Sequence, residues 1–431
     1  MNTRKRYDKQ KRIGIVGGGP SGMAAAITAA RQGADVTILE RNDRLGKKIL
    51  STGNGKCNLG NLDLSVDSYY GSAIPFIQQT LARFSEQDTI DFFNRLGLMI
   101  KDRNGYLYPA SEQAASVLDV LRFELQALGV KVVTECKVNH IKKDSRSGEI
   151  LVSDGEKEYR FDALILACGS KAAPKTGSDG SGYKLAKQLG HSLIPTVPAL
   201  VQLKCKEDYL KAVAGVRADA EIRVLGAEKG NVHAKSRSAG FCAVERGELQ
   251  LTEYGISGIP VFQLSRQVNY ILREKEHVKV EIDFLPDLSK EEFEKLCAER
   301  EGILGRGRTV EEFFTGMLNK KIMLLFMKLA GLKGHIPVED ADPAKLKQVY
   351  VLCKNWHVTV NGSNSYDNAQ VCAGGVDTAE ITENFESRLV PGVYIVGELL
   401  DVDGKCGGYN LHWAWASGVL AGRAAVSINE Q

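Results

Sequence analysis

Glycine spacing near the start of the chain is the feature of this sequence with the clearest chemistry. Gly17, Gly19 and Gly22 form the pattern G-x-G-x-x-G, and they directly follow an apolar run at residues 13–16. In this pattern the first glycine makes a tight turn, the second lets the backbone approach a pyrophosphate, and the third lets a helix pack closely on a strand. The free N–H groups at the start of the helix that follows favour phosphate groups. The spacing therefore predicts a dinucleotide site.

A carboxylate after the next apolar run supports this interpretation. Residues 35–39 are predicted to form a strand, and Glu40 follows it, 23 residues after Gly17. An acidic residue at about this distance binds ribose hydroxyls in dinucleotide-binding folds. A glycine turn in an ordinary βαβ unit would leave Glu40 unexplained.

Two later segments repeat the form of an apolar strand that ends in glycine. They are residues 163–169 and residues 392–397, and Glu398 directly follows the second. Because parallel strands bind ligands at their carboxyl ends, we expect both ends to converge with the end at Gly17 on one long ligand. The small meander predicted at residues 137–161 and the terminal strand–glycine–acid motif favour FAD over NAD.

Composition and charge argue against several classes of protein. A length of 431 residues predicts two or three domains, and 43% hydrophobic with 25% charged residues is typical of a soluble globular protein. The 56 basic and 53 acidic residues nearly balance, so no nucleic-acid partner is expected. No run of about 18 apolar residues is present, so we expect no membrane span. The nine cysteines lack metal-binding spacing, which predicts no metal site and free thiols in the cytoplasm.

Helical and strand patterns indicate how these groups are positioned. The predicted helices cover residues 21–32, 111–128 and 411–425. Short alternating strands lie between residues 200 and 284, where Arg246-Gly247 is a hairpin signal, and residues 288–353 have a helical pattern. The nucleotide motifs lie on either side of this stretch. We therefore predict that a β-rich unit with a helical excursion interrupts the nucleotide domain.

Longer motifs across the chain resemble a known family. They lie at residues 17–22 with Glu40, 46–58, 108–111, 164–169, 252–260, 374–376 and 397–411. On these motifs the chain resembles the flavoproteins with two dinucleotide-binding domains. More closely, it resembles the BaiN-type bacterial NAD(P)/FAD-dependent oxidoreductases, the family of 3-dehydro-bile-acid Δ4,6-reductases, over almost its whole length. The resemblance implies an α/β fold with a Rossmann-like FAD-binding domain of the glutathione-reductase and fumarate-reductase type, interrupted by a β-barrel-like domain that carries a helical subdomain.

Domain bounds follow from the changes in sequence pattern. The FAD-binding domain takes residues 1–195 and 362–431, the inserted barrel-like domain takes 196–285 and 354–361, and the helical subdomain takes 286–353. Residues 177–182 contain glycines but follow a loop rather than a strand, so no separate nicotinamide-binding domain is predicted. The electrons would come from a nicotinamide that reaches the flavin directly, from the substrate or from another protein.

The resemblance implies a set of contacts with non-covalent FAD. Glu40 would bind the adenosine ribose, and Val138 would meet the adenine through its backbone. The loop at residues 52–58 would run along the pyrophosphate and ribityl chain, where Glu398 would accept from a hydroxyl. The backbone at residues 407–411 would face the N1 and C2 carbonyl edge of the flavin. The full set of implied cofactor-binding residues is Gly17, Gly19, Pro20, Ser21, Gly22, Glu40, Arg41, Lys48, Thr52, Gly53, Asn54, Gly55, Cys57, Asn58, Val138, Ala167, Cys168, Gly169, Gly397, Glu398, Gly407, Gly408, Tyr409, Asn410 and Leu411.

Four side chains near the expected flavin ring are candidates for catalysis. Tyr409 and His412 could deliver a proton, as could Asp403, and each could equally stabilise the local structure. Cys57 could be a redox thiol, although no second cysteine is near it in the sequence. A wall or spacer role is the plainer interpretation of Cys57, and a pair with Cys406 stays open.

These observations together predict an FAD-dependent oxidoreductase that moves a hydride between flavin N5 and a carbon of a small organic substrate. By resemblance, the reaction would be reduction of a conjugated enone, such as a steroid or bile acid, with NAD(P)H as donor. The alternatives are a flavin-dependent amine or small-molecule oxidase, a tRNA-modifying or tRNA-binding flavoprotein, and a redox-sensing flavoprotein without turnover. The sequence does not determine the oligomeric state.

Overall fold

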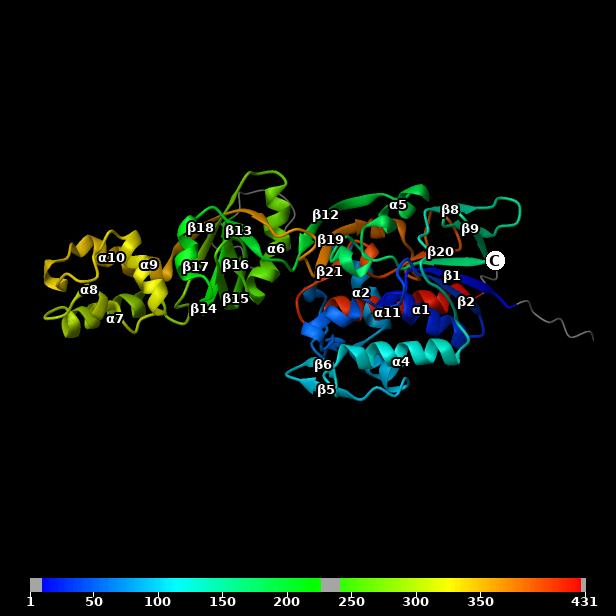
Figure 1. Ribbon diagram of the computed structural model, residues 1–431, viewed down its shortest axis with the longest axis horizontal. Helices are drawn as coiled ribbons and strands as arrows, with labels where there is room; N and C mark the ends of the chain where they lie inside the picture. Colours follow the sequence, from blue (N-terminus) through cyan, green and yellow to red (C-terminus); the bar gives the residue numbers. More distant parts are fainter. Residues whose placement is uncertain (1–9, 226–240, 428–431) are drawn as a thin grey trace, which may run out of the picture. The chain divides into compact units, whose positions relative to one another are not determined.

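The chain folds into two units, each with its own hydrophobic core. A computed structural model describes residues 10–225 and 241–427 (Figure 1). The first unit consists of Met1–Val197 with Gln370–Gln431, and the second consists of Pro198–Ala369. One cluster of buried apolar side chains fills each unit. The two units are described in turn.

A five-stranded parallel sheet forms the centre of the first unit. Its strands are β1 (Arg12–Val16), β2 (Asp35–Leu39), β7 (Lys131–Val133), β11 (Ala163–Leu166) and β20 (Val393–Ile395). They lie in the order β20-β11-β1-β2-β7, and every neighbouring pair is parallel. All residues of β11 and β20 are buried, which explains why they read as continuous apolar runs rather than alternating ones. The three strands predicted to end in glycine are therefore immediate neighbours.

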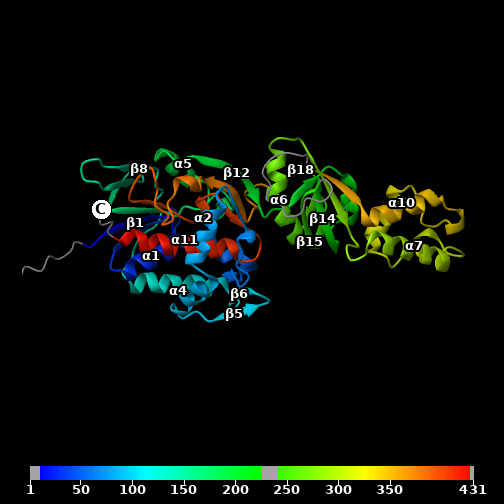
Figure 2. The same ribbon diagram turned by 180° about the vertical axis from the view of Figure 1, so that it is seen from behind.

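Two helices of the first unit pack closely against each other. They are α1 (Pro20–Arg31) and α11 (Tyr409–Val426), which lie side by side in both views (Figure 2). A Cβ atom on Gly418 would lie only 2.3 Å from the carbonyl oxygen of Ser21, so the two backbones touch at this point. The other helices of the unit are α2 (Ile74–Arg83), α3 (Glu86–Asn94), α4 (Ala114–Ala127) and α5 (Ser181–Gln188).

Small sheets of two or three strands complete the first unit. The meander consists of β8 (His140–Lys143), β9 (Ile150–Ser153) and β10 (Glu158–Phe161). The remaining strands are β3 (Gly60–Asn61), β5 (Ile100–Arg103) and β6 (Tyr106–Pro109) in one sheet, β4 (Tyr69–Gly71) with β21 (Val402–Gly404), and β12 (Leu193–Ala199) with β19 (Val371–Val376).

The second unit contains a closed six-stranded antiparallel barrel and a helical excursion. The barrel order is β13 (Leu203–Cys205), β16 (Gly255–Ser257), β15 (Phe241–Thr252), β14 (Arg217–Leu225), β17 (Val278–Asp283) and β18 (Trp356–Ser363). Helix α6 (Ile259–Leu272) follows β16 along the chain. The excursion consists of α7 (Lys290–Leu304), α8 (Val310–Phe314), α9 (Lys320–Leu329) and α10 (Pro343–Lys354). This architecture confirms the predicted fold class, a Rossmann-type α/β domain with an inserted barrel.

Two details of the second unit differ from the sequence pattern. The hairpin predicted at Arg246-Gly247 is wrong, because both residues lie inside β15 and pair with Glu221 and Ala220. Gly247 lies against α6 instead, since a Cβ atom there would be 3.5 Å from the ring of Pro260. The unit also continues past residue 361, because β18 runs to Ser363 and its neighbour Asn364 donates its N–H to the carbonyl of Gln202.

Candidate cofactor site

Three adjacent strands of the parallel sheet end in glycines with positive φ. The φ angles are 105° at Gly17 after β1, 68° at Gly169 after β11, and 68° at Gly397 after β20. A Cβ atom on Gly17 would lie 2.5 Å from the carbonyl oxygen of Ala167. A Cβ atom on Gly397 would lie 2.5 Å from Ser21 Oγ. Both the positive φ angles and the short distances therefore require glycine at these positions. The ends of the three strands form one continuous edge of the sheet.

The start of α1 provides space for a pyrophosphate. Gly22 lies against the turn, because a Cβ atom there would be 2.0 Å from the carbonyl oxygen of Gly17. Gly19 is the opposite case, since a Cβ atom there would meet nothing within 4 Å. Pro20 takes the first helical position, where a missing N–H costs nothing. An open space at the positive end of a helix fits a dinucleotide phosphate group.

Glu40 is held next to this turn by local hydrogen bonds. Its side chain is buried, and its Oε2 accepts from the N–H of Gly18 at 2.7 Å. Its Oε1 accepts from both the backbone N–H and the side-chain amide of Asn42, each at 2.8 Å. An ionised carboxylate has about four acceptor positions, so capacity is left for a ribose hydroxyl. The carbonyl of Glu40 accepts from Cys136, which brings the buried Val138 close to the same end of the site.

Glu398 is the centre of a second, long-range network. Its Oε1 accepts from Ser170 Oγ at 2.7 Å and from the N–H of Cys372 at 3.0 Å. Its Oε2 accepts from Lys48 Nζ at 2.7 Å. Sequence reasoning named Glu398 and Lys48 but missed Ser170 and Cys372. The position of Ser170 directly after Gly169 was the signal that could have found it.

The loop at residues 52–58 turns through left-handed conformations. The φ angles of Gly53, Asn54, Gly55 and Cys57 are 54°, 53°, 83° and 59°. For Asn54 and Cys57, which are not glycines, such angles are uncommon and typical of functional loops. A Cβ atom on Gly55 would meet nothing within 4 Å, so this part of the loop has open space beside it.

Neither of the two cysteines considered for redox chemistry forms a disulfide in this structure. Cys57 is fully buried, and burial raises the pKa of its thiol to about 12, although a hydrogen bond with Thr52 lowers it. Burial also raises the pKa of Cys406 to about 12. None of the nine cysteines forms a disulfide, so Cys57 and Cys406 are not bonded to each other. A thiol is nucleophilic as the thiolate, so this geometry favours a packing role for Cys57.

The start of α11 presents free backbone donors at the end of the site that Glu398 occupies. The first intrahelical bond runs from the N–H of His412 to the carbonyl of Gly408, which leaves the N–H groups of residues 409–411 without an intrahelical acceptor. Gly408 has a φ of 92°, and a Cβ atom there would lie 2.6 Å from the carbonyl oxygen of Gly60. Asn410 fixes the preceding loop, because its amide both donates to and accepts from the backbone of Gly404 at 2.8 Å.

His412 lies behind this helix start rather than at an open surface. Its ring is fully buried, with Nδ1 3.0 Å from Thr89 Oγ1 and Nε2 3.2 Å from the carbonyl oxygen of Phe84. A carbonyl only accepts, so Nε2 carries the proton and Nδ1 accepts from the Thr89 hydroxyl. Burial lowers the pKa of His412 to about 4. Both ring nitrogens are occupied, and this arrangement favours a positioning role over proton donation.

Tyr409 and Arg41 are each held by a protein partner. Burial raises the pKa of Tyr409, although a side-chain hydrogen bond with Ser68 lowers it. The ring of Tyr69 packs edge-on against Tyr409 at 5.7 Å, and its hydroxyl donates to the Tyr409 carbonyl. Arg41 pairs with Asp179. Each of these residues is therefore fixed near the predicted site.

Two absences hold for the part of the chain that the structure describes. Within residues 10–225 and 241–427, no group of histidine, cysteine, aspartate and glutamate side chains could hold a metal ion. Over the same residues, no helix is both long enough and apolar enough to cross a membrane.

Parallel strands that end in close-packed glycines, an open phosphate turn and a carboxylate beside it define the class of protein. This is a Rossmann-type flavoprotein, an FAD-dependent oxidoreductase. The chain belongs to the family described as HI0933-like protein Rossmann domain, which matches residues 11–424.

Named relatives cover nearly the whole chain. The chain is 45% identical over 417 residues to a 3-dehydro-bile acid delta(4,6)-reductase from Clostridium scindens, with 96% of this chain and 98% of the relative covered. It is 29% identical over 424 residues to a ribosomal RNA dihydrouridine synthase from Haemophilus influenzae, with 97% and 98% covered. A solved 3-ketosteroid delta1-dehydrogenase from Sterolibacterium denitrificans matches at 11% identity and a TM-score of 0.49, with 97% of this chain and all of that chain covered.

Proposed function

We propose that this protein reduces a carbon–carbon double bond conjugated to a carbonyl group of a small organic substrate, with NAD(P)H as electron donor. The observation that carries the proposal is the 45% identity, over almost the full length of both chains, to a protein named as a Δ4,6-reductase of a 3-dehydro-bile acid. The names of the 29% identical relatives describe related chemistry, because dihydrouridine is uridine whose conjugated double bond has been reduced. A steroid-like enone is therefore the first substrate to test.

In this proposal the residues of the chain bind and orient the cofactor. When bound, FAD supplies hydride transfer to and from carbon. The turn at Gly19 would hold the pyrophosphate, Glu40 the adenosine ribose, and Glu398 with Lys48 the ribityl chain. The free N–H groups at residues 409–411 would favour negative charge at the N1 and C2 carbonyl edge of the flavin.

Reduction of an enone also needs a proton for the carbon next to the carbonyl group. Among the candidate side chains, Tyr409 fits this step best. Its hydroxyl keeps its proton at neutral pH because burial raises its pKa, and it stands at the first position of α11. Cys57 and His412 are enclosed by protein groups and would position the loop and the helix.

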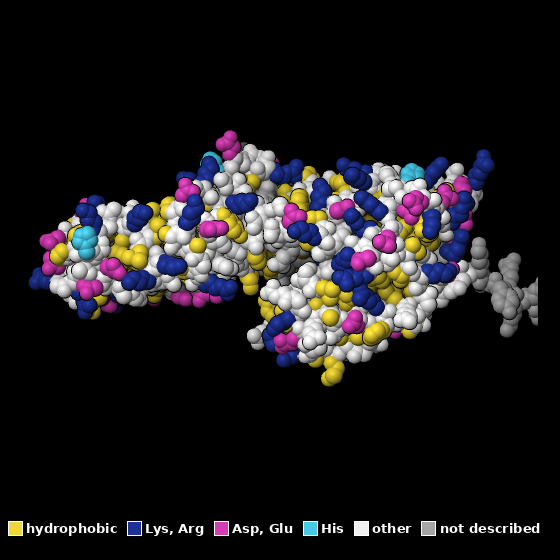
Figure 3. Space-filling view, in the orientation of Figure 1, with side chains coloured by type: hydrophobic (Ala, Val, Ile, Leu, Met, Phe, Trp, Pro, Cys, Tyr) yellow, Lys and Arg dark blue, Asp and Glu magenta, His cyan; other side chains and the backbone are white. Residues whose placement is uncertain are grey.

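Reduction of uracil in RNA is the second candidate. The observation in its favour is the 29% identity to ribosomal RNA dihydrouridine synthases over 97% of this chain. An RNA-binding protein needs a basic face for the phosphates. Figure 3 shows Lys and Arg side chains interspersed with Asp and Glu on the visible face of each unit, and the net charge is only +3. The balance of charge favours a small substrate.

Anaerobic flavin reduction and reoxidation test the proposal. NADH or NADPH should bleach the flavin absorbance, and a 3-oxo-Δ4,6 bile acid should restore it while the saturated 3-oxo compound should not. Restoration by a uridine-containing transcript alone would favour the second candidate. Bleaching by amines, with no response to either nicotinamide, would contradict the proposal and indicate an oxidase.

A further inference from the structure

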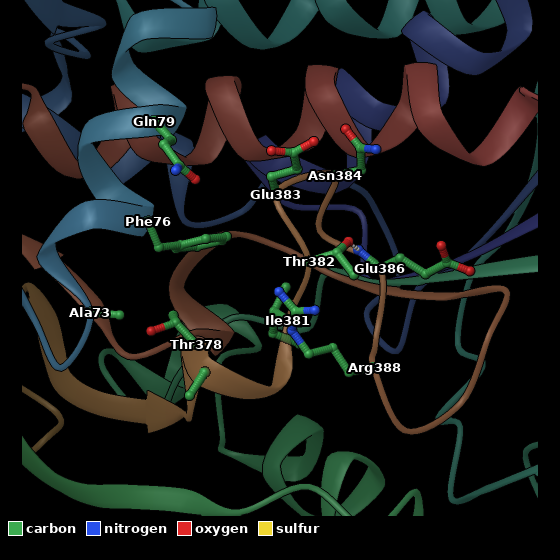
Figure 4. Close-up of a pocket in the computed structure, with 11 residues that line it drawn as sticks. Ala73, Phe76, Gln79, Thr378, Ile381, Thr382, Glu383, Asn384, Glu386 and Arg388 are labelled. Atoms are coloured by element: carbon green, nitrogen blue, oxygen red, sulfur yellow. Dashed lines mark hydrogen bonds between the residues drawn. The ribbon is translucent and has the colours of Figure 1, made fainter.

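A cavity lies in the first unit, and its lining residues differ from those of the candidate cofactor site. Its volume is about 670 Å³, and it opens between α2 and the segment 378–388 (Figure 4). Pockets of this size hold small organic ligands. None of the residues predicted to bind FAD lines it, so it is a separate feature of the fold.

One wall of the cavity is apolar and firmly packed. Phe76 from α2 lines it, together with Ala73 and Ile381. The ring of Phe76 packs against Phe385 at 5.3 Å and against Trp413 at 6.0 Å. These contacts hold the wall in place, so a ligand would meet a preformed apolar surface.

The segment 378–388 is fastened by a buried histidine. His191 Nδ1 lies 2.8 Å from Glu380 Oε2, and its Nε2 lies 2.9 Å from Ser387 Oγ. These two contacts hold both ends of the segment that lines the cavity. The backbone N–H of Arg388 also donates to the carbonyl of Glu380. The cavity is therefore a fixed part of the first unit rather than a gap between loose loops.

A buried hydroxyl in the lining has no partner. Thr378 lines the cavity and is only 2% exposed, and its Oγ1 makes no hydrogen bond within the described part of the chain. A buried polar atom without a hydrogen bond destabilises a folded protein, so nearly all such atoms are paired. A polar group of a ligand in the cavity would supply the missing bond.

Arg388 supplies a positive charge at the same cavity. Its side chain is exposed and reaches toward Ile381 in Figure 4, and no carboxylate of the described residues pairs with it. The two carboxylates that line the cavity do not compete for it. Glu386 Oε1 accepts from the N–H of Gly392 at 2.7 Å, and the carboxylate of Glu383 points away from Arg388 in Figure 4. A guanidinium in this position suits a carboxylate or a phosphate.

We propose that this cavity binds a small amphipathic anion. Its apolar body lies against Phe76 and Ile381, its carboxylate or phosphate pairs with Arg388, and a polar group bonds to the Thr378 hydroxyl. The site acts independently of the proposed reductase activity, since the cavity and the cofactor site share none of their lining residues.

Calorimetric titration of the FAD-loaded protein tests this site with two probes, octanoate for a carboxylate and AMP for a phosphate. We expect at least one probe to bind with a stoichiometry of one, and the probe that binds identifies the class of anion. Arg388→Gln should weaken its binding roughly tenfold. Thr378→Val should weaken it about fivefold. The matched control Arg146→Gln, on the exposed turn between β8 and β9, should leave binding unchanged.

Two results would overturn the proposal. One is that neither probe binds at millimolar concentration, and the other is that a probe binds equally well to the wild type and to both cavity variants. Thermal unfolding gives an independent check. Because the Thr378 hydroxyl has no partner, Thr378→Val should keep or raise the melting temperature of the ligand-free protein, and a clear decrease would show that the hydroxyl is already bonded within the protein.

Discussion

The two carboxylates of the candidate site, Glu40 and Glu398, are held in different ways. Glu40 accepts three hydrogen bonds from groups close in sequence, Gly18 and Asn42, and no cation pairs with it in the described structure. Glu398 also accepts three hydrogen bonds, but two of its donors, Lys48 and Ser170, lie 350 and 228 residues away in the sequence. The adenosine end of the site is thus built by one βαβ unit, whereas the ribityl end exists only when four segments meet. A substitution at the adenosine end should therefore disturb only nearby residues, whereas a substitution at the ribityl end should disturb several segments.

The largest expected effect is at the pyrophosphate turn. Gly19→Val should abolish FAD retention, because the new side chain would fill the open space at the start of α1. The fold should survive, since a Cβ atom at Gly19 meets nothing within 4 Å. Flavin content after gel filtration measures the loss. Gly302→Val is the matched control, because a Cβ atom there also meets nothing within 4 Å, and it lies in α7 of the second unit. Full flavin content in Gly19→Val would contradict the assignment.

The next effect concerns the ribityl end. Glu398→Ala should weaken FAD binding tenfold or more, since hydrogen bonds to charged groups contribute about 1.5–3 kcal/mol. Fluorescence titration of the apoprotein gives the dissociation constant. Lys48→Met should have a smaller effect alone, and the double variant should be less weakened than the sum of the single effects predicts, because the two side chains are in contact. Additive effects would show that the ion pair does not couple to FAD.

The third effect tests whether α11 is held from behind by a neutral histidine. Burial lowers the pKa of His412 from 6.5 to about 4, so between these values the unfolded chain binds the extra proton. The native state therefore loses stability as the pH falls from about 6.5 toward 4, by a maximum on the order of 3 kcal/mol.

Melting temperatures across this pH range measure the effect. His412→Gln keeps a hydrogen-bond donor and an acceptor at this position. It should make the melting temperature less dependent on pH. His140→Gln, which changes an exposed histidine of β8, should leave the dependence as it is. An unchanged slope in His412→Gln would show that the ring titrates normally in the folded protein.

The smallest effect is expected in the loop between the two ends. Cys57→Ala should keep flavin content and turnover within about twofold, because a buried thiol whose pKa is near 12 is not a thiolate at neutral pH. Steady-state rates of the variant and the wild type, measured with an enone that the wild type reduces, test this expectation. Loss of turnover with intact FAD binding would assign redox duty to Cys57 and contradict the packing role.

Local motifs of the sequence predicted much of this molecule. The order of strand, glycines, helix, strand and Glu40 predicted the parallel sheet, and the alternation after residue 200 predicted an inserted β-rich unit, which the structure shows to be a closed barrel. The error at Arg246-Gly247 has a physical cause. A glycine is as useful for close packing inside a strand as for a turn, and only the neighbouring Pro260 distinguishes the two.

By itself the sequence determined the class of fold and the adenosine end of the site, because glycine spacing and strand periodicity act over a few residues. Only the tertiary structure decided the partners of Glu398, the enclosure of His412 by Thr89 and Phe84, and the unpartnered Thr378 in its cavity. These features join segments hundreds of residues apart or depend on burial. No local pattern encodes them, because burial and long-range hydrogen bonds arise only when the whole unit packs.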